Sequence, residues 1–172
     1  MKVLLLGGAG YIGRVVANRL KDEMHGIKII DLFNFSNPAD AAVIASVKIA
    51  DTRFLNVMDF ENIDVVLDLA ALSNDPAGEL NPLVTRENNV GARIRAAALA
   101  KAAGVQRYVL FSSCSVYGAS EDVVDERSRL NPLTEYAAAN VEAEGGVLGL
   151  GDSAFAVTVF RLATVFGLSP SM

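Results

Sequence analysis

Residues 2–13 read Lys2-Val3-Leu4-Leu5-Leu6-Gly7-Gly8-Ala9-Gly10-Tyr11-Ile12-Gly13, an apolar run that leads directly into closely spaced glycines. The apolar run predicts a short strand, and the pattern from about 10 to 24 predicts a helix. Between a strand and a helix, glycines at this spacing indicate a turn that holds the pyrophosphate of a dinucleotide. Gly7 would permit the tight turn, Gly10 would let the backbone approach the phosphates, and Gly13 would let helix and strand pack closely.

The start of this helix supports the same interpretation, because its free N–H groups and positive potential favour a bound phosphate. Tyr11 and Ile12 belong to the same turn and are predicted to line the dinucleotide. The alternative interpretation is a plain strand-to-helix turn, since glycine occurs in tight turns of every kind.

The rest of the chain alternates between strand and helix patterns. Further strands are predicted at 27–30, 46–50, 64–69, 107–112 and 156–161, and further helices at 82–103 and 134–148. Continuous apolar strands separated by helices indicate a parallel sheet covered on both faces. Right-handed crossovers then favour a doubly wound α/β fold of the Rossmann type, with strand order 3-2-1-4-5-6. The polar stretches 34–40 and 118–132 are predicted to be loops.

Composition excludes several classes of function. The chain has 172 residues, of which 52% are hydrophobic, and this fits one globular domain. Its net charge is −5 with scattered cations, so no nucleic-acid surface is predicted. No apolar run reaches the ~20 residues of a membrane span. A single cysteine, Cys114, excludes an internal disulfide and fits a cytoplasmic protein. No ligand pair has metal-binding spacing, so no metal site is predicted.

Asp31 stands at the end of the second predicted strand. At this place in a Rossmann fold, a carboxylate accepts hydrogen bonds from the adenosine ribose and repels a 2′-phosphate. The position therefore favours NAD over NADP as the cofactor. The alternative is a solvated aspartate in a turn.

Several further segments, in the same order along the chain, carry a resemblance to a known family. Together with the glycine turn and Asp31, they make the sequence similar to extended short-chain dehydrogenases/reductases. Within that group the chain resembles the NAD-dependent nucleotide-sugar epimerase/dehydratase family over essentially its whole length. The segments are Asp51, Leu69-Ala70-Ala71, Asn88, Phe111-Ser112-Ser113-Cys114-Ser115-Val116-Tyr117-Gly118 and Tyr136.

The resemblance implies roles for these residues. Asp51 would meet the adenine, Leu69, Ala70 and Ala71 would line the dinucleotide, and Asn88 would steady the active site from the central helix. Ser113 and Tyr136 match the family's catalytic serine or threonine and its catalytic tyrosine. The resemblance also implies a nucleotide-sugar substrate and a homodimer formed through the helices at 82–103 and 134–148.

The implied chemistry needs these side-chain types. Oxidation of a sugar hydroxyl requires a base for its proton, and a tyrosine serves only if its pKa, about 10 in water, is lowered. A hydroxyl such as that of Ser113 can stabilise the charge that develops on the same oxygen. The alternatives are a strand-end serine that caps a turn and a half-buried helix tyrosine.

One position departs from the family's motif, which has a lysine four residues after the tyrosine. Here the sequence reads Tyr136-Ala137-Ala138-Ala139-Asn140. Asn140 can hydrogen-bond a ribose hydroxyl, but it has no charge to stabilise a tyrosinate. The nearest cations in sequence are Arg127, Arg129 and Arg161, and the sequence favours none of them as a replacement.

Three functional hypotheses follow. The first is an NAD-dependent oxidoreductase of the epimerase/dehydratase type, in which hydride is transferred transiently to bound NAD. The second is a non-catalytic NAD-binding sensor or subunit, and the third is a simple ketoreductase. Residues 1–172 are expected to form the NAD-binding domain, with the family's C-terminal substrate domain absent. Residues 73–76 could form a substrate loop or a solvated turn.

Overall fold

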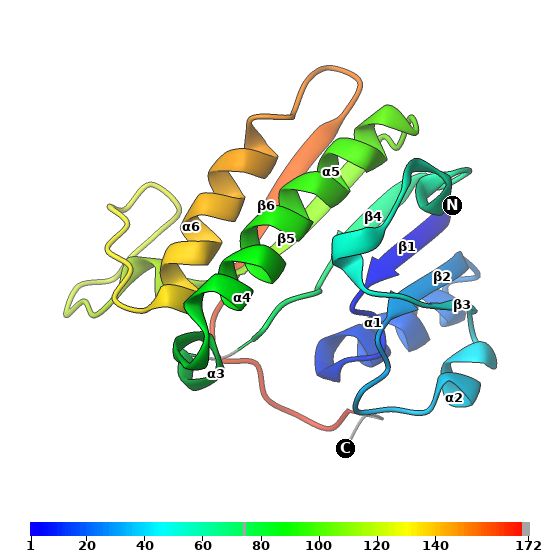
Figure 1. Cartoon of the computed structure of the whole chain (residues 1–172), viewed down its shortest axis with the longest axis horizontal. Coiled ribbons are helices and arrows are strands. Elements are labelled where there is room, and N and C mark those ends of the chain that lie inside the picture. The colour runs from blue at the N-terminus through cyan, green and yellow to red at the C-terminus, as the bar shows by residue number, and fades with distance from the viewer. Residues whose placement is uncertain (74, 170–172) are drawn as a thin grey trace.

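The computed structural model of the chain describes residues 1–73 and 75–169 (Figure 1). Its centre is one parallel sheet of six strands in the order β3-β2-β1-β4-β5-β6, so the predicted topology is confirmed. The strands are β1 (Lys2–Leu6), β2 (Gly26–Asp31), β3 (Ser46–Ile49), β4 (Val65–Asp68), β5 (Arg107–Ser113) and β6 (Ala156–Leu162). Leu6 of β1 lies in register with Ile30 of β2 and with Asp68 of β4, so the strands end at one common edge.

Helices lie between the strands, and those at Tyr11–Asp22, Arg93–Ala102 and Glu135–Leu148 fall within the ranges expected from the sequence. The helices are α1 (Tyr11–Asp22), α2 (Pro38–Ala42), α3 (Asp75–Leu80), α4 (Pro82–Arg86), α5 (Arg93–Ala102) and α6 (Glu135–Leu148). Short 3-10 turns are η1 (Thr52–Phe54), η2 (Val57–Phe60) and η4 (Cys114–Tyr117).

Three expectations need correction. The predicted α-helix over 82–103 is not uniform, because residues 87–92 form a π-helical segment, η3 (Glu87–Ala92), between α4 and α5. The predicted loop 34–40 runs into α2, where the side chain of Asn37 accepts a hydrogen bond from the Ala39 N–H and proline occupies the first turn. In the stretch 73–76, Asp75 begins α3, and Asn74 lies outside the described residues.

Two hydrophobic cores cover the two faces of the sheet, because successive side chains of a strand point to opposite faces. On β1, Val3 and Leu5 join a core with Ala17 of α1 and Ala41 of α2. Leu4 and Leu6 join the other core, which contains residues of α5 and α6. Figure 1 shows α5 and α6 side by side over β5. In the described part of the chain, no helix is long and apolar enough to cross a membrane.

Candidate functional site

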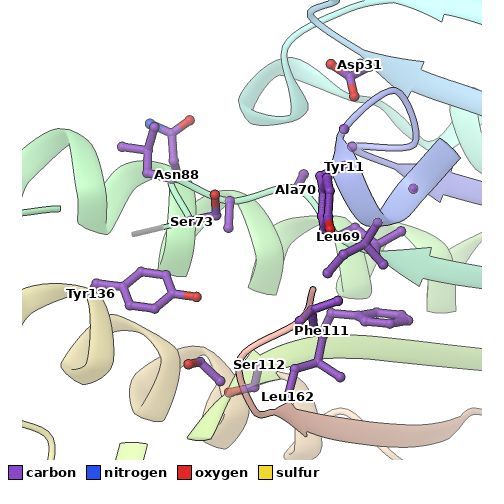
Figure 2. Close-up of a pocket in the computed structure, with 18 of the residues that line it drawn as sticks. Tyr11, Asp31, Leu69, Ala70, Ser73, Asn88, Phe111, Ser112, Tyr136 and Leu162 are labelled. Carbon is purple, nitrogen blue, oxygen red and sulfur yellow. The ribbon is translucent and has the colours of Figure 1, made fainter. Parts of the chain in front are cut away.

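A cavity of about 960 Å³ opens at the edge of the sheet where the strands end (Figure 2). It is lined by the glycine turn after β1 and by residues at or just after the ends of the five remaining strands, β2 to β6. Ligands of doubly wound sheets bind in this crevice, outside the carboxyl ends of the strands. The predicted site residues that line it are Gly7, Gly10, Tyr11, Ile12, Gly13, Asp31, Asp51, Leu69, Ala70, Ala71, Asn88, Ser113 and Tyr136.

Gly7 and Gly13 are required by the packing of the turn, whereas Gly10 is not. Gly7 has a φ of 73°, and a Cβ built on it would lie 2.8 Å from the Ala70 nitrogen. A Cβ on Gly13 would lie 2.6 Å from the Gly8 Cα. The fold itself therefore requires both glycines. A Cβ on Gly10 would meet one described atom within 4 Å, the Gly7 carbonyl oxygen at 3.4 Å. The protein tolerates a side chain at Gly10, so the open space there is available to a ligand.

Helix α1 starts at this open space. Gly10 is its N-cap and has no side chain to occupy the free N–H groups of the first turn. That turn, all of it within the described residues, carries no acidic side chain. The helix therefore presents uncompensated positive potential to the cavity, and this potential favours a phosphate.

The Asp31 carboxylate fastens the end of β2 to the glycine turn. Its Oδ2 accepts a hydrogen bond of 2.9 Å from the Ala9 N–H, and its Oδ1 accepts one of 2.9 Å from the Phe33 N–H. These bonds fix a carboxylate in the lining of the cavity, and Figure 2 shows the Asp31 side chain near the glycine turn.

Asp51 is held in a similar way at the end of β3. Arg53 donates to its Oδ2 from Nη2 at 2.6 Å and from Nε at 3.0 Å. The hydrogen bonds from Arg53 hold the pKa of the Asp51 carboxyl below its usual range. The cavity thus has two fixed carboxylates on the side of β2 and β3.

Tyr136 and Ser113 lie on the other side of the cavity. Ser113 ends β5, and its Oγ accepts a hydrogen bond of 3.1 Å from the Ser115 N–H. Figure 2 shows the Tyr136 ring reaching from α6 towards the ends of β5 and β6. Helix α6 is capped by Thr134, whose Oγ1 accepts a hydrogen bond of 3.1 Å from the Ala137 N–H.

Helix α3, which the sequence did not predict, packs against this start of α6. Thr134 donates its hydroxyl proton to Asp75, and the Glu135 N–H donates to Glu79 at 2.7 Å. A Cβ on Gly78 would lie 3.1 Å from the Cβ of Tyr136. Glycine therefore lets α3 approach Tyr136 closely, and α3 forms a wall beside the tyrosine.

The π-helical segment places two neighbouring asparagines differently. Asn88 lines the cavity, and its Nδ2 donates to the Val84 carbonyl at 2.8 Å. Asn89 is fully buried, and its amide both accepts from the Leu72 N–H at 2.8 Å and donates to the Leu72 carbonyl at 3.0 Å. Asn89 thus holds the cavity segment that follows β4. Sequence reasoning missed this residue, and a π-helix leaves no pattern from which to find it.

The strand-end cation Arg161 is already paired. It donates from Nη2 to the buried Glu144 at 2.7 Å and from Nη1 to the Tyr117 hydroxyl at 2.8 Å. Glu144 in turn accepts the hydroxyl proton of Ser112. Arg161 therefore stabilises the structure behind Ser113 and is not available to Tyr136.

The segment after β6 forms a further wall of the cavity and returns to the glycine turn. The Tyr11 hydroxyl donates to the Gly167 carbonyl at 2.5 Å, and the Ser169 hydroxyl donates to the Tyr11 carbonyl at 2.7 Å. Cys114 also lines the cavity and is exposed. Among the described residues, no group of three or more His, Cys, Asp or Glu side chains is placed to hold a metal ion.

Comparison with known proteins agrees with this geometry. The sequence profile of the NAD dependent epimerase/dehydratase family matches residues 3–171. The chain belongs to this family.

Individual relatives show the same family. A UDP-glucose 4-epimerase from Lactobacillus helveticus is 31% identical, over 98% of this chain and 53% of the relative. A probable UDP-arabinose 4-epimerase from Oryza sativa subsp. japonica is 27% identical, over 98% of this chain and 45% of the relative. The chain thus spans about half the length of the curated relatives it matches.

Solved structures of similar proteins have the same fold. MoeE5 in complex with UDP-glucuronic acid and NAD has a TM-score of 0.85 at 28% identity, covering 94% of this chain and 54% of that one. A UDP-glucose-4-epimerase from Stenotrophomonas maltophila with bound NAD and formylated UDP-arabinopyranose has a TM-score of 0.86 at 27% identity, covering 94% of this chain and 52% of that one.

For a member of this epimerase/dehydratase family, Asn140 lies in an unexpected place. Among the predicted site residues it is the one that does not line the cavity, and it is only 1% exposed. Its Oδ1 accepts a hydrogen bond of 3.1 Å from Nη1 of Arg93, and its Nδ2 donates to the Tyr136 carbonyl at 3.0 Å. Arg93 is itself 2% exposed and forms an ion pair of 3.3 Å with Asp68. The sequence around position 140 does not point to Arg93, because Arg93 lies 47 residues earlier in the chain.

Proposed function

We propose that this chain binds NAD(H) and acts with it on a nucleotide-activated sugar, by transient transfer of hydride from the sugar to the bound cofactor. The observation that carries the proposal is the cavity itself. The glycine turn and Asp31 line one side, and Ser113 and Tyr136 line the other. A binding surface for the dinucleotide and the side chains for proton transfer therefore share one space.

The residues on the first side are compatible with NAD. The open space at Gly10 and the start of α1 suit a pyrophosphate, which a side chain at this position would displace. Asp31 is fixed by two backbone N–H groups at a place where it can accept from the ribose hydroxyls. The same carboxylate would repel the 2′-phosphate of NADP. When bound, NAD supplies the hydride acceptor of the reaction.

The residues on the second side would handle the proton. The phenolate oxygen of Tyr136 would take the proton of the sugar hydroxyl and become a neutral phenol, and the Ser113 hydroxyl would donate a hydrogen bond to the same sugar oxygen. Helix α3 and Gly78 hold the wall beside Tyr136, so that its ring is directed into the cavity. The same proposal includes two further points. Residues 1–172 form a dinucleotide-binding domain, and two copies of it form a homodimer through α4–α6.

A second candidate function is an NAD-binding module without catalysis. The observation that favours it is the environment of Asn140, which has no charge and is directed away from the cavity towards Arg93. Position 140 therefore supplies no charged group on the cavity side to assist proton transfer by Tyr136.

One experiment separates the two functions. The NAD-loaded protein is mixed with UDP-, dTDP- and GDP-sugars at several pH values, and the absorbance of reduced nicotinamide is followed. We expect reduction by at least one sugar, at a rate that rises with pH because more phenolate is present. Tyr136→Phe is the matched control, because it removes only the hydroxyl. Binding of NAD without reduction by any sugar would establish the non-catalytic module, and equal rates in Tyr136→Phe would remove the role of Tyr136.

A further inference from the structure

The guanidinium of Arg93 lies beneath the cavity, in one of the most deeply buried places of the molecule. Arg93 begins α5 and is 2% exposed. Its Nε is 3.3 Å from Oδ2 of Asp68, and its Nη2 donates to the Asp68 carbonyl at 3.3 Å. Nη2 also donates to the Phe111 carbonyl at 2.5 Å. The same Oδ2 of Asp68 accepts from the Tyr108 hydroxyl at 2.8 Å.

These contacts join the elements that carry both sides of the proposed site. Asp68 ends β4 and leads into the cavity segment 69–73, while Phe111 lies two residues before Ser113 on β5. The third partner, Asn140, belongs to α6, one turn after Tyr136. A single side chain therefore fixes two strand ends and one helix relative to one another.

Asn140 extends this set of contacts to Tyr136. Its Oδ1 receives the hydrogen bond from Arg93 at 3.1 Å, and its Nδ2 donates to the backbone carbonyl of Tyr136 at 3.0 Å. The amide of Asn140 is thus a bridge between the guanidinium and the peptide unit that carries the tyrosine. Asn140 is only 1% exposed and is not among the residues that line the cavity.

We propose that Arg93 and Asn140 form one positioning unit, in which the buried guanidinium holds the ends of β4 and β5 and, through the Asn140 amide, the turn of α6 that carries Tyr136. The proposal rests on the proposed function only in taking Tyr136 as the reacting side chain. A buried ion pair adds little net stability to a fold, although removal of one partner is costly. We therefore assign to the pair of Arg93 and Asp68 the role of fixing the positions of the elements that it joins. In this unit the side chain at position 140 contacts Arg93 and not the cofactor.

The unit has one carboxylate, Asp68, for its one cation. A lysine introduced at position 140 would bring an ammonium into the buried region around the guanidinium, where Asn140 now accepts from Arg93. Like charges close together in a buried site repel strongly. When the guanidinium is also removed, this repulsion disappears. The ammonium introduced at position 140 can then form an ion pair with Asp68.

The test is a double-mutant cycle with Arg93→Met, Asn140→Lys and the two combined. The urea midpoint reports stability, and the ¹³Cζ resonance of Tyr136 in tyrosine-labelled protein reports the position of the phenol. The chain has four tyrosines, and Tyr136→Phe assigns the signal. We expect each single substitution to lower the midpoint and move the resonance, and we expect the combined variant to recover both towards wild type. Additive losses, or a wild-type midpoint and resonance in Asn140→Lys alone, would overturn the proposal.

A milder pair of variants covers the case in which a charged variant does not fold. Asn140→Ala removes the bridge and should move the Tyr136 resonance, while NAD affinity measured by calorimetry changes by less than about threefold. Gly145→Ala is the matched control on α6, since its new Cβ meets no described atom within 4 Å. A tenfold loss of NAD affinity with an unmoved resonance would show that residue 140 contacts the cofactor, and would overturn the proposal. Failure of the wild type to bind NAD would defeat the proposed function, but the midpoint and resonance would still test the unit.

Discussion

The two sides of the cavity are built in different ways. On the dinucleotide side, Gly7, Gly10 and Gly13 come from one turn, and Asp31 is fixed by backbone N–H groups of Ala9 and Phe33. On the tyrosine side, the reacting groups depend on side-chain pairs between distant elements. Arg93 reaches Asn140 across 47 residues, and Asp75 reaches Thr134 across 59.

This difference explains how each side responds to substitution. The dinucleotide side depends on backbone conformation and empty space, so a single methyl group in the wrong place disrupts it. The tyrosine side depends on paired buried groups, so the loss of one partner leaves the other uncompensated.

Gly13→Ala should have the largest effect, on folding itself. The new Cβ would lie 2.6 Å from the Gly8 Cα and 2.7 Å from the Gly7 carbonyl oxygen, and both are backbone atoms that cannot move aside cheaply. We expect a loss of about 3 kcal/mol or more in the free energy of unfolding, measured by urea denaturation. Gly145→Ala serves as the control and should cost nothing. Equal midpoints for the two variants would mean that the turn does not pack as described.

Arg161→Met should have the next largest effect, this time through lost charge pairing. The substitution leaves Glu144, whose side chain is 3% exposed, without its bidentate partner. Breaking a buried ion pair from one side costs about 3 kcal/mol, and less when the pair is partly exposed, as Arg161 is. The matched control is Arg19→Met, which breaks an exposed pair with Glu23 and should change the free energy of unfolding by less than about 0.5 kcal/mol. Similar losses in the two variants would contradict the structural role of Arg161.

Gly78→Ala should act on catalysis and leave cofactor binding intact. Its Cβ would sit 3.1 Å from the Cβ of Tyr136, so α3 or the tyrosine must move by a few tenths of an ångström. We expect the rate of sugar-dependent NAD reduction to fall by about tenfold, with an unchanged NAD dissociation constant. An equal loss of NAD affinity would show that the two sides of the cavity are not separate.

Arg53→Met should have the smallest effect, visible mainly as a change in pH dependence. Hydrogen bonds from Arg53 hold the pKa of Asp51 below its ordinary value of 3.8. A lowered pKa in the folded protein contributes stability above the ordinary value, and that contribution disappears as the pH falls through the folded value. The urea midpoints of variant and wild type should therefore differ near neutral pH and converge below about pH 3.8. A gap that widens in acid would contradict this origin of the shift.

The contrast also explains what could be predicted from the sequence. The strand order and the roles of Gly7 and Gly13 follow from local patterns and from topology, and the structure agrees with them. Tyr136 and Ser113, which the family resemblance singled out, both line the cavity. Arg93 escaped prediction because its partners lie far away along the chain, and Asn89 because it lies in a π-helical segment. Helix α3 escaped prediction because six residues span fewer than two turns and show no helical periodicity.

The central claim is that this cavity is an NAD site built on the glycine turn, and calorimetric titration of wild type and Gly10→Ala tests it most directly. The alanine Cβ meets only the Gly7 carbonyl oxygen among described atoms within 4 Å, so the variant should unfold at nearly the wild-type urea concentration. Wild type should bind NAD more tightly than NADP, and Gly10→Ala should bind NAD at least about a hundredfold more weakly. A folded Gly10→Ala protein that binds NAD as tightly as wild type would contradict the account.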